Sequence, residues 1–453
     1  MRHTHAPKVA VVGMGKTGLS VLRHLRRAHI QCECFDEATV QLPEDLQGVP
    51  LHTGPLPMDG TFLQFDKVIV SPGVDWRHPA LVEARKCGVD VHGDLDEFLA
   101  NYSGNLIAVT GTNGKTTVTQ MIVLLLETLP GGCDAGGNIG VPMLDLLADR
   151  KPKRVALELS SFQLERAKYV HPHYAVLLNV QPDHEDMHES MEAYRAAKVS
   201  IFSQMVKGDT AILPADDEWQ ALVDALIQRG VQVKRFGTVA AQDTNAVAGV
   251  LCTKDGDKVF WQHGDVRKTI PVSSLMVRGR HQQQNIAVAA QVAADFGVSA
   301  AVIEEALMSF QGLEHRLEFV GRIAGRDWYN DSKATNPDAA IAALRSFDEV
   351  VWICGGLRKD LALDGLIDVA KTHVRFACVI GEDTKAYEAM LTQAGVPFKV
   401  SKTMKEAVVH AKERGDCPVL LSPAAASQDQ YPHYAERGAD FIQAIRKLGG
   451  ADD

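Results

Sequence analysis

The segment Gly111–Thr117, with the sequence GTNGKTT, has the composition of a phosphate-binding loop. It follows the apolar run LIAVT and precedes VTQMIVLLLETL, which predicts a strand, a loop and a helix. Glycines in such a loop let backbone N–H groups surround phosphate oxygens, and the helix N-terminus adds a favourable dipole. Lys115 supplies a positive charge for the β- and γ-phosphates, and the Thr116 hydroxyl can bind Mg²⁺. Val109 occupies the position of the first P-loop glycine, so this is a shortened relative of that loop. The alternative is a glycine-rich turn with a surface lysine.

A second glycine-rich loop follows the first expected strand, KVAVV. Gly13, Gly15 and Gly18 have the spacing of the dinucleotide-binding fingerprint, and Asp36 ends the next expected strand. Taken alone, this motif favours an NAD-dependent oxidoreductase, and the other alternative is a tight turn that binds nothing. Two phosphate-binding loops in separate parts of one chain are more typical of a protein that handles two nucleotides.

The sequence HEDMH, which begins at His184, matches the zinc-protease pattern HExxH. That pattern requires a continuous helix with both histidines on one face. Here a proline separates the motif from the expected strand YAVLLNV, so we place His184 at a strand end or in a loop. Ligands of α/β sheets bind at that edge, and we expect Asp183 and His184 to support Mg²⁺ chemistry there.

Glu158 lies within the expected apolar strand RVALELS. A charge in such a strand requires a cation partner, which predicts a role in the same Mg²⁺ site. The alternative is a buried acid whose hydrogen bonds are satisfied.

The polar cluster NDSKATNP occupies residues 330–337. Asn336 followed by Pro337 predicts a helix N-cap with proline in the first turn. That interpretation leaves Asp331 and Lys333 unexplained. Lys198, in AYRAAKVSIF, lies on an expected helix and by itself predicts a solvated surface residue.

Short β-branched runs alternate with helical patterns along most of the 453 residues, which predicts an α/β fold with parallel sheets. We expect three domains, at residues 1–93, 94–312 and 313–453. The first contains KVAVVG and KVIVSPG, the second NLIAVTG, RVALELS and YAVLLNV, and the third EVVWICGG, FACVIG and CPVLLSP. Within the second, residues 246–272 alternate and turn like a small antiparallel excursion.

Composition excludes several classes of protein. The net charge of −10 argues against general binding to nucleic acid, which needs a basic face. The eight cysteines form no C-x-x-C pair, and Cys354 and Cys378 are expected to be small buried residues. No signal sequence or bilayer-spanning run is expected, so we predict a soluble cytoplasmic protein without membrane partners.

Taken together, these motifs resemble the Mur ligases, which build the peptide of bacterial peptidoglycan. The resemblance covers the whole chain in order, and the branch of the family that adds D-glutamate is the most similar. The motifs that carry it are GMGKTGLS, SPG, GTNGKTT, GGNIG, ELSSFQL, NVQPDH, YRAAK, EHRLE, NDSKATN and SPAAASQDQ.

The resemblance implies a Rossmann-like N-terminal domain, a central P-loop-type ATPase domain and a Rossmann-like C-terminal domain. It implies a monomer that uses ATP, two Mg²⁺ ions, UDP-N-acetylmuramoyl-L-alanine and D-glutamate. An acyl phosphate would form on the substrate carboxylate, and the amine of glutamate would then attack it.

The resemblance also implies roles for individual residues. The catalytic residues would be Lys115, His184 and Lys198. The metal ligands would be Thr116, Glu158, His184 and a carbamylated Lys198. ATP would contact Gly111, Thr112, Asn113, Gly114, Lys115, Thr116, Thr117, Asn285, Arg316 and Asp331. The UDP substrate would contact Gly15, Lys16, Thr17, Asp36, Gly73 and Asn138. D-Glutamate and the acyl group would contact Lys333, Thr335, Lys359, Ser427, Gln428 and Tyr434.

Two further hypotheses remain open at this point. One is an NAD-dependent dehydrogenase with a second nucleotide site, and the other is an ATP-gated switch or scaffold without catalytic activity. Phosphate release that requires both the UDP substrate and D-glutamate would support only the ligase.

Overall fold

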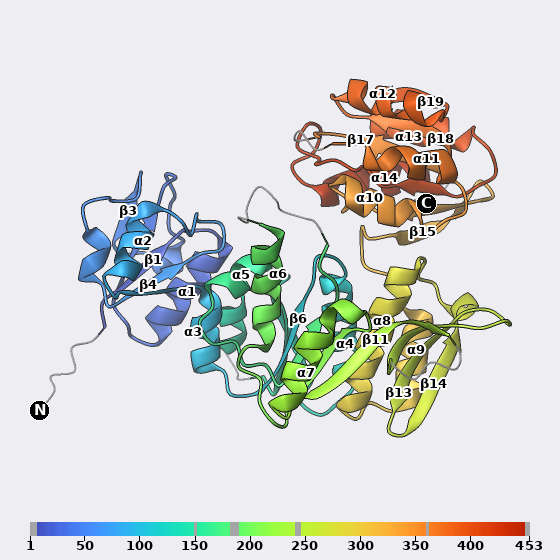
Figure 1. Ribbon diagram of the computed structural model, residues 1–453. Helices are drawn as coiled ribbons and strands as arrows, with labels where there is room; N and C mark the ends of the chain where they lie inside the picture. Colours follow the sequence, from blue (N-terminus) through green and yellow to red (C-terminus); the bar gives the residue numbers. More distant parts are fainter. Residues whose placement is uncertain (1–6, 149–151, 182–189, 241–245, 359–361, 449–453) are drawn as a thin grey trace, which may run out of the picture. The chain divides into compact units, whose positions relative to one another are not determined.

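A computed structural model describes residues 7–148, 152–181, 190–240, 246–358 and 362–448. Figure 1 shows three α/β regions, each built on its own sheet. By their internal contacts the described residues form two compact units. The first unit contains the N-terminal sheet and most of the central sheet, and the second contains the C-terminal sheet.

The N-terminal sheet has five parallel strands in the order β3-β2-β1-β4-β5. Its elements are β1 (Val9–Val12), α1 (Lys16–Arg27), β2 (Cys32–Asp36), β3 (Leu51–Thr53), β4 (Lys67–Val70), α2 (Pro79–Lys86), β5 (Asp90–His92) and α3 (Asp94–Asn101). The order reverses between β1 and β4, so the loops after these two strands flank the crevice where such sheets bind ligands.

The central sheet has nine strands in the order β14-β13-β12-β11-β10-β9-β6-β8-β7. Its strands are β6 (Asn105–Thr110), β7 (Asp134–Gly137), β8 (Arg154–Glu158), β9 (Tyr174–Leu177), β10 (Thr210–Pro214), β11 (Gln232–Ala240), β12 (Ala248–Cys252), β13 (Lys258–His263) and β14 (Val266–Pro271). Its helices are α4 (Lys115–Leu126), α5 (Ser161–Arg166), α6 (Met191–Val199), α7 (Gln220–Gln228), α8 (Arg280–Asp295) and α9 (Ala300–Ser309). Strand β6 lies between β8 and β9 and pairs in parallel with both, so the loop after β6 opens at the strand-order reversal.

The C-terminal sheet has six strands in the order β15-β16-β20-β17-β18-β19. Its strands are β15 (Glu318–Ile323), β16 (Arg326–Asn330), β17 (Val350–Gly355), β18 (Val374–Ile380), β19 (Phe398–Lys402) and β20 (Val419–Leu421). Its helices are α10 (Pro337–Leu344), α11 (Gly365–His373), α12 (Thr384–Ala394), α13 (Met404–Lys412) and α14 (Tyr434–Leu448). Strand β15 is antiparallel to β16 at one edge, and the other neighbouring strands of this sheet pair in parallel.

Both faces of the C-terminal sheet are buried, as its apolar strands predict. Val350, Trp352 and Cys354 pack with α10, α11 and α12 on one face. Val351 and Ile353 pack with α13 and α14 on the other. Cys354 and Cys378 are fully buried, as expected from their apolar settings.

Residues 246–272 do not form a separate layer. Strands β12, β13 and β14 extend the central sheet at one edge, and β12 pairs in parallel with β11. Only Gly264 and Asp265 join β13 to β14, and a connection that short makes an antiparallel hairpin. The short connections from β12 to β13 and from β13 to β14 both agree with the expected antiparallel excursion, and β12 joins it to the rest of the sheet by pairing in parallel with β11.

Among the described residues, no helix has both the length and the apolar character needed to cross a membrane.

Helix α1 packs against β1 through a stripe that includes Gly18, Val21, Leu22 and Leu25, which are buried. A Cβ atom on Gly18 would lie 1.9 Å from the carbonyl oxygen of Gly13, so only glycine permits this approach. Gly15, the N-cap of α1, has φ of −70° and no atom within 4 Å of an added Cβ. Gly13 and Gly18 therefore allow the backbone of α1 to pack closely on the loop after β1, whereas Gly15 leaves open space at the helix N-terminus.

We predict that Gly18→Ala lowers the free energy of unfolding by about 3 kcal/mol or more, because backbone has to move to relieve the clash. Gly15→Ala is the matched control and should lower it by no more than about 1 kcal/mol, because alanine is a poorer N-cap than glycine but meets no clash. Urea unfolding of the full chain, followed by circular dichroism, measures both. Equal stability of the two variants would contradict this account of the packing.

Candidate functional site

The loop between β6 and α4 ends at Gly114, in a backbone conformation that only glycine adopts without strain. Gly114 has φ of +88° and is the N-cap of α4. A Cβ atom on Gly114 would lie 2.6 Å from Oδ1 of Asn285, a buried residue of α8. The predicted ATP-binding residue Asn285 therefore lies directly against the predicted phosphate loop.

The polar residues after β9 hold this loop in place. The N–H of Asn113 donates to Oδ1 of Asn179 (2.8 Å), and Nδ2 of Asn179 donates back to the carbonyl of Asn113 (3.0 Å). The N–H of Gln181 donates to the Thr112 hydroxyl (3.0 Å). The expected strand YAVLLNV extends to Val180, but β9 ends at Leu177, and Asn179 and Gln181 bond to the loop instead.

His184 and Asp183 follow directly and lie outside the described residues, so their predicted roles stay predictions.

Lys115 is the first residue of α4, and its ammonium group lies over the loop. Nζ donates to the carbonyls of Gly111 (2.8 Å) and Thr112 (2.9 Å). Within the loop, Thr117 is buried, whereas Thr116 directs its hydroxyl to the end of the neighbouring strand β8.

That strand ends in Glu158, whose side chain is almost completely buried. The Thr116 hydroxyl donates to Oε2 (2.7 Å), and Nδ2 of Asn138 donates to Oε1 (3.0 Å). The backbone N–H of Asn138 also donates to the Glu158 carbonyl (2.9 Å). The structure therefore brings Thr116 and Glu158 together, as expected for a shared site, and adds Asn138, whose contact with Glu158 was not expected from the sequence.

These residues fit a magnesium ion by their donor chemistry. Glu158 and Thr116 offer a carboxylate and a hydroxyl oxygen beside a phosphate-type loop, and Mg²⁺ is usually held by few protein oxygens together with phosphate and water. Among the described residues no group of three or more His, Cys, Asp or Glu side chains has metal-site spacing.

Lys198 is not the solvated residue that its helical pattern alone predicted. It lies on α6 with 2% of its surface exposed, and Nζ donates to the carbonyl of Gly111 (2.9 Å). The same Nζ lies 4.5 Å from the ring centroid of Tyr194. The Tyr194 hydroxyl is 3.0 Å from the Thr112 hydroxyl, so α6 contacts the loop twice. Sequence reasoning did not select Tyr194, although it lies one helical turn before Lys198 on the same face.

Apart from Asn138, which follows β7 of the central sheet, the predicted UDP-substrate residues gather at the carboxyl edge of the N-terminal sheet. The Asp36 carboxylate accepts from the N–H groups of Met14 (2.6 Å) and Ala38 (2.8 Å). Gly15 and Lys16 are exposed at the start of α1, and Thr17 is half-buried. Gly73, in the loop after β4, is exposed with open space around it. The Ser71 hydroxyl donates to the Gly13 carbonyl (2.7 Å) and joins the two loops.

In the second unit, Asp331 directly follows β16 and is buried. It accepts from the Ser422 hydroxyl (2.9 Å) and from the N–H of Leu317 (3.1 Å). Burial raises the pKa of Asp331 to about 7. Arg316 lies between His315 and Leu317, which have positive φ angles of 62° and 48°. Such backbone strain is frequent at functional sites.

Arg437 connects the remaining predicted residues of this unit. It is buried on α14 and donates to the carbonyls of Ser332, Ala425 and Ala426. It thus joins the segment after β16, which carries Lys333 and Thr335, to the segment after β20, which carries Ser427 and Gln428. Nζ of Lys333 lies 4.1 Å from the ring centroid of Tyr434. Ser427 is buried and Gln428 is exposed.

Sequence reasoning missed Arg437, and a signal was present. Arg437, Phe441 and Ile445 recur every four residues on α14, so the arginine occupies the buried stripe of the helix. Burial lowers its pKa to about 10. Lys359 lies outside the described residues, and its predicted contact with D-glutamate stays a prediction.

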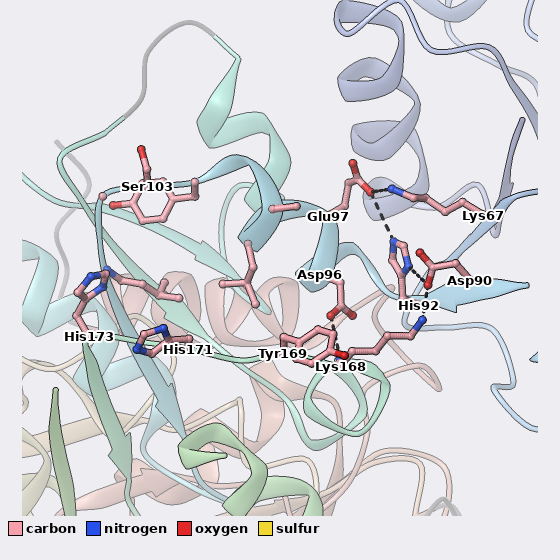
Figure 2. Close-up of a pocket in the computed structure, with 15 residues that line it drawn as sticks. Lys67, Asp90, His92, Asp96, Glu97, Ser103, Lys168, Tyr169, His171 and His173 are labelled. Atoms are coloured by element: carbon pink, nitrogen blue, oxygen red, sulfur yellow. Dashed lines mark hydrogen bonds and ion pairs between the residues drawn. The ribbon is translucent and has the colours of Figure 1, made fainter. Parts of the chain in front are cut away.

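A cavity of about 670 Å³ lies elsewhere on the first unit (Figure 2). It is lined by residues before β6 and β9, at the amino ends of these strands, whereas the phosphate loop follows the carboxyl end of β6. Its charged groups pair with one another: Lys67 with Glu97 (2.8 Å), His92 with Asp90 (3.2 Å), and Lys168 with Asp90. We therefore do not assign a substrate to this cavity.

Three regions of the chain match known protein families. Residues 7–93 match the Mur ligase MurD-like N-terminal domain, residues 109–293 the Mur ligase middle domain, and residues 315–424 the glutamate ligase domain of Mur ligases.

Two curated relatives are similar over nearly their whole length, and both are named UDP-N-acetylmuramoylalanine–D-glutamate ligase. The protein of Methylococcus capsulatus is 35% identical, over 97% of this chain and 95% of its own. That of Exiguobacterium sibiricum is 34% identical, over 98% and 97%.

Solved structures show the same fold. UDP-N-acetylmuramate-alanine ligase from Thermotoga maritima has a TM-score of 0.58 at 19% identity, over 97% of this chain and 99% of its own. The MurF ligase from the same organism, solved with ADP, has a TM-score of 0.58 at 17% identity, over 98% and 96%.

The pKa of Asp331 gives a stability prediction. A carboxyl whose folded pKa is raised stabilises the fold fully below its unfolded pKa of about 4, and loses that contribution as the pH rises through 7. Raising the pH from 5 to 8 should therefore lower the free energy of unfolding of the wild type by about 2–3 kcal/mol relative to that of Asp331→Asn, which cannot ionise at this position. Calorimetric unfolding of both proteins at the two pH values measures it. A difference that does not change with pH would contradict the assignment.

Proposed function

Because the chain belongs to the Mur ligase family, we propose that it joins D-glutamate to UDP-N-acetylmuramoyl-L-alanine and converts ATP to ADP and phosphate. The observation that carries the proposal is the cluster of Lys115, Thr116 and Glu158 where β6 and β8 end, in a chain similar end to end to ligases of that name. The reaction belongs to peptidoglycan precursor synthesis, and we place it in the cytoplasm of the cell with the protein acting as a monomer.

ATP is assigned to the loop Gly111–Thr117. Backbone N–H groups at the start of α4 suit its phosphates, and Asn285 is adjacent to Gly114. In the structure the Lys115 ammonium bonds to two loop carbonyls, and we infer that it turns to the γ-phosphoryl oxygens when ATP binds. Arg316 and Asp331 of the second unit are assigned to the nucleotide as well.

Thr116 and Glu158, with His184, would hold magnesium, which neutralises charge on the phosphoryl oxygens. Glu158 serves as the fixed negative charge in this arrangement, and Asn138 orients it.

The UDP substrate is assigned to the N-terminal sheet. Gly15, Lys16 and Thr17 lie at the N-terminus of α1, where unpaired N–H groups and the helix dipole favour a diphosphate. Asp36 already accepts two backbone hydrogen bonds beside this loop, and Gly73 faces it from the loop after β4. Asn138 is assigned to the sugar end of this substrate.

D-Glutamate is assigned to the second unit. Lys333, Lys359, Thr335, Ser427, Gln428 and Tyr434 form the proposed set. Lys333 and Lys359 supply the positive charge that a dicarboxylate requires. Arg437 bonds to the segment that carries Lys333 and Thr335 and to the segment that carries Ser427 and Gln428.

The chemistry follows from the poor reactivity of a carboxylate. A carboxylate oxygen of the UDP substrate attacks the γ-phosphorus, the bond to ADP breaks, and an acyl phosphate forms. The amine of D-glutamate attacks the acyl carbon, and a tetrahedral intermediate collapses with loss of phosphate. Lys115 stabilises charge that develops during the first step. His184 is our candidate for the group that accepts the proton of the amine.

A phosphate-release assay tests this function. We expect release from ATP only when UDP-N-acetylmuramoyl-L-alanine and D-glutamate are both present. Lys115→Ala serves as the control for contaminating phosphatases and should reduce the rate at least ~10³-fold, because a principal charge stabiliser is removed. Hydride transfer to a nicotinamide, or ATP binding without substrate-dependent turnover, would overturn the proposal.

We further propose that Lys198 is carbamylated in the active enzyme. Its amine would combine with CO₂, lose a proton and become a carboxylate-like metal ligand. The position of Nζ supports this, because its contact with the Gly111 carbonyl and the Tyr194 ring places the lysine at the phosphate loop, where a metal ligand would be needed.

Lys198→Ala should accordingly be nearly inactive. Lys198→Glu should be partly active, because glutamate restores a carboxylate, although on a shorter side chain. Short carboxylic acids should rescue the alanine variant, whereas high bicarbonate should not. Steady-state phosphate release measures the activity of both variants and the effect of each additive. Full activity of Lys198→Ala without any additive would rule the carbamate out.

A further inference from the structure

Arg166 is the last residue of α5, a short helix in a fixed position. The helix begins three residues after Glu158, and Ser160 and Gln163 form a capping box at its start. Leu164 anchors it in the continuous core that the N-terminal and central sheets share. Any group at the end of α5 is therefore held rigidly relative to the phosphate loop.

The guanidinium group of Arg166 bonds to the N-terminal sheet. Nη1 donates to the carbonyl of Ser71 (2.8 Å) and Nη2 donates to the carbonyl of Val74 (2.9 Å). These carbonyls bracket Pro72 and Gly73, the loop after β4. The planar fork of arginine donates to the two carbonyls from separate nitrogens in a fixed geometry, which the single nitrogen of a lysine does not reproduce. Burial lowers the pKa of Arg166, while Glu165, Asp94 and Asp75 favour the charged form.

The bracketed loop is also bonded to the glycine-rich loop. The Ser71 hydroxyl donates to the Gly13 carbonyl, and a Cβ atom on Gly13 would lie 2.7 Å from Cγ2 of Val74. The loops after β1 and β4 are therefore one bonded assembly on both sides of the strand-order reversal. A shift of the Ser71–Val74 segment would move the walls of this crevice.

A second arginine holds the same loop from within the N-terminal region. Arg85 of α2 donates to the carbonyl of Trp76 (2.8 Å) and stacks on its ring at 4.3 Å. Arg166 lies 5.4 Å from the same ring. Arg85 can keep the loop folded without Arg166, but it comes from the same sheet as the loop. Arg166, by contrast, ties the loop to the helix that follows Glu158.

We propose that Arg166 is a positioning residue that sets the Ser71–Val74 loop for the UDP substrate relative to the phosphate loop. This inference rests on the proposed function, because it names how the substrate crevice is fixed. It makes Arg166 a determinant of UDP-substrate affinity without contact to either nucleotide.

Lys168 provides the matched control. It lies two residues beyond Arg166 and also bonds to the N-terminal region. Its N–H donates to Oδ1 of Asp96 (2.8 Å) and its Nζ pairs with Asp90, on the wall of the cavity in Figure 2. Asp90 begins β5, so this contact is at the amino end of the sheet, whereas Ser71–Val74 follow the carboxyl end of β4. Lys168→Met removes a charged contact of the same segment without touching the loop.

The experiment compares Arg166→Met, Arg166→Lys and Lys168→Met with the wild type in steady-state phosphate release. We expect Arg166→Met to raise KM for UDP-N-acetylmuramoyl-L-alanine by about 10- to 100-fold, which is a fraction of what two hydrogen bonds from a charged donor contribute, because Arg85 still holds part of the loop. KM for ATP should change less than about twofold, and Arg166→Lys should be intermediate. Lys168→Met should leave both KM values at the wild-type level. Calorimetric titration of each protein with the same UDP substrate should give parallel changes in Kd.

The outcomes separate this inference from the proposed function. If the wild type neither binds nor turns over the UDP substrate, the proposed function fails. If the wild type does both and the Arg166 variants keep its KM and Kd, or raise KM for ATP equally, the positioning role is overturned. Thermal melting verifies folding, and if Arg166→Met does not fold, the KM values of Arg166→Lys decide.

Discussion

A carboxylate buried at the end of an apolar strand is the constraint on which the site depends. Glu158 is removed from water and accepts from two neutral donors, Thr116 and Asn138. Neutral hydrogen bonds alone compensate a buried charge incompletely, so the arrangement favours a cation beside the loop. The strand places this charge next to Lys115 and Lys198, which both bond to the carbonyl of Gly111. The carboxylate, the two lysine side chains and the open helix N-terminus together define where a nucleotide and its metal would bind.

In all three sheets, side-chain hydrogen bonds fix the loops that carry the candidate site residues. In each, a loop at a strand-order reversal carries residues that we assign to a substrate or nucleotide, and buried polar groups fix that loop. Asn179 holds the loop after β6, Ser71 joins the loops after β1 and β4, and Arg437 joins those after β16 and β20. Because loops gain little rigidity from their own backbone, these side-chain bonds carry the positional accuracy that phosphoryl transfer requires.

Much of the fold and part of the site could be predicted from the sequence. The glycine spacing and Asp36 gave the N-terminal strands and helix, and Asn336 caps α10 as expected, accepting from the N–H of Ala339 (2.8 Å). These signals are local, because each depends on the backbone geometry of a few neighbouring residues. The contact of Thr116 with Glu158 was predictable because parallel strands end at one edge.

The errors come from contacts that are distant in the sequence. A helical pattern could not show that Lys198 is buried against a loop 87 residues away. The end of β9 at Leu177 depends on bonds to Asn113, and the roles of Arg166 and Arg437 depend on carbonyls of other segments. Strand β12 has no pattern of its own that reveals its parallel partner. Tertiary packing decides such features, and local propensity does not encode them.

The central claim is that the substrate carboxylate is activated as an acyl phosphate before the amine attacks. It is tested most directly by labelling both oxygens of that carboxylate with ¹⁸O in UDP-N-acetylmuramoyl-L-alanine, and by analysing the released phosphate by mass spectrometry. The account predicts that each phosphate released with D-glutamate carries one ¹⁸O atom, because the carboxylate oxygen that attacks phosphorus leaves with it. Unlabelled phosphate, formed at the same rate as the amide product, would contradict it.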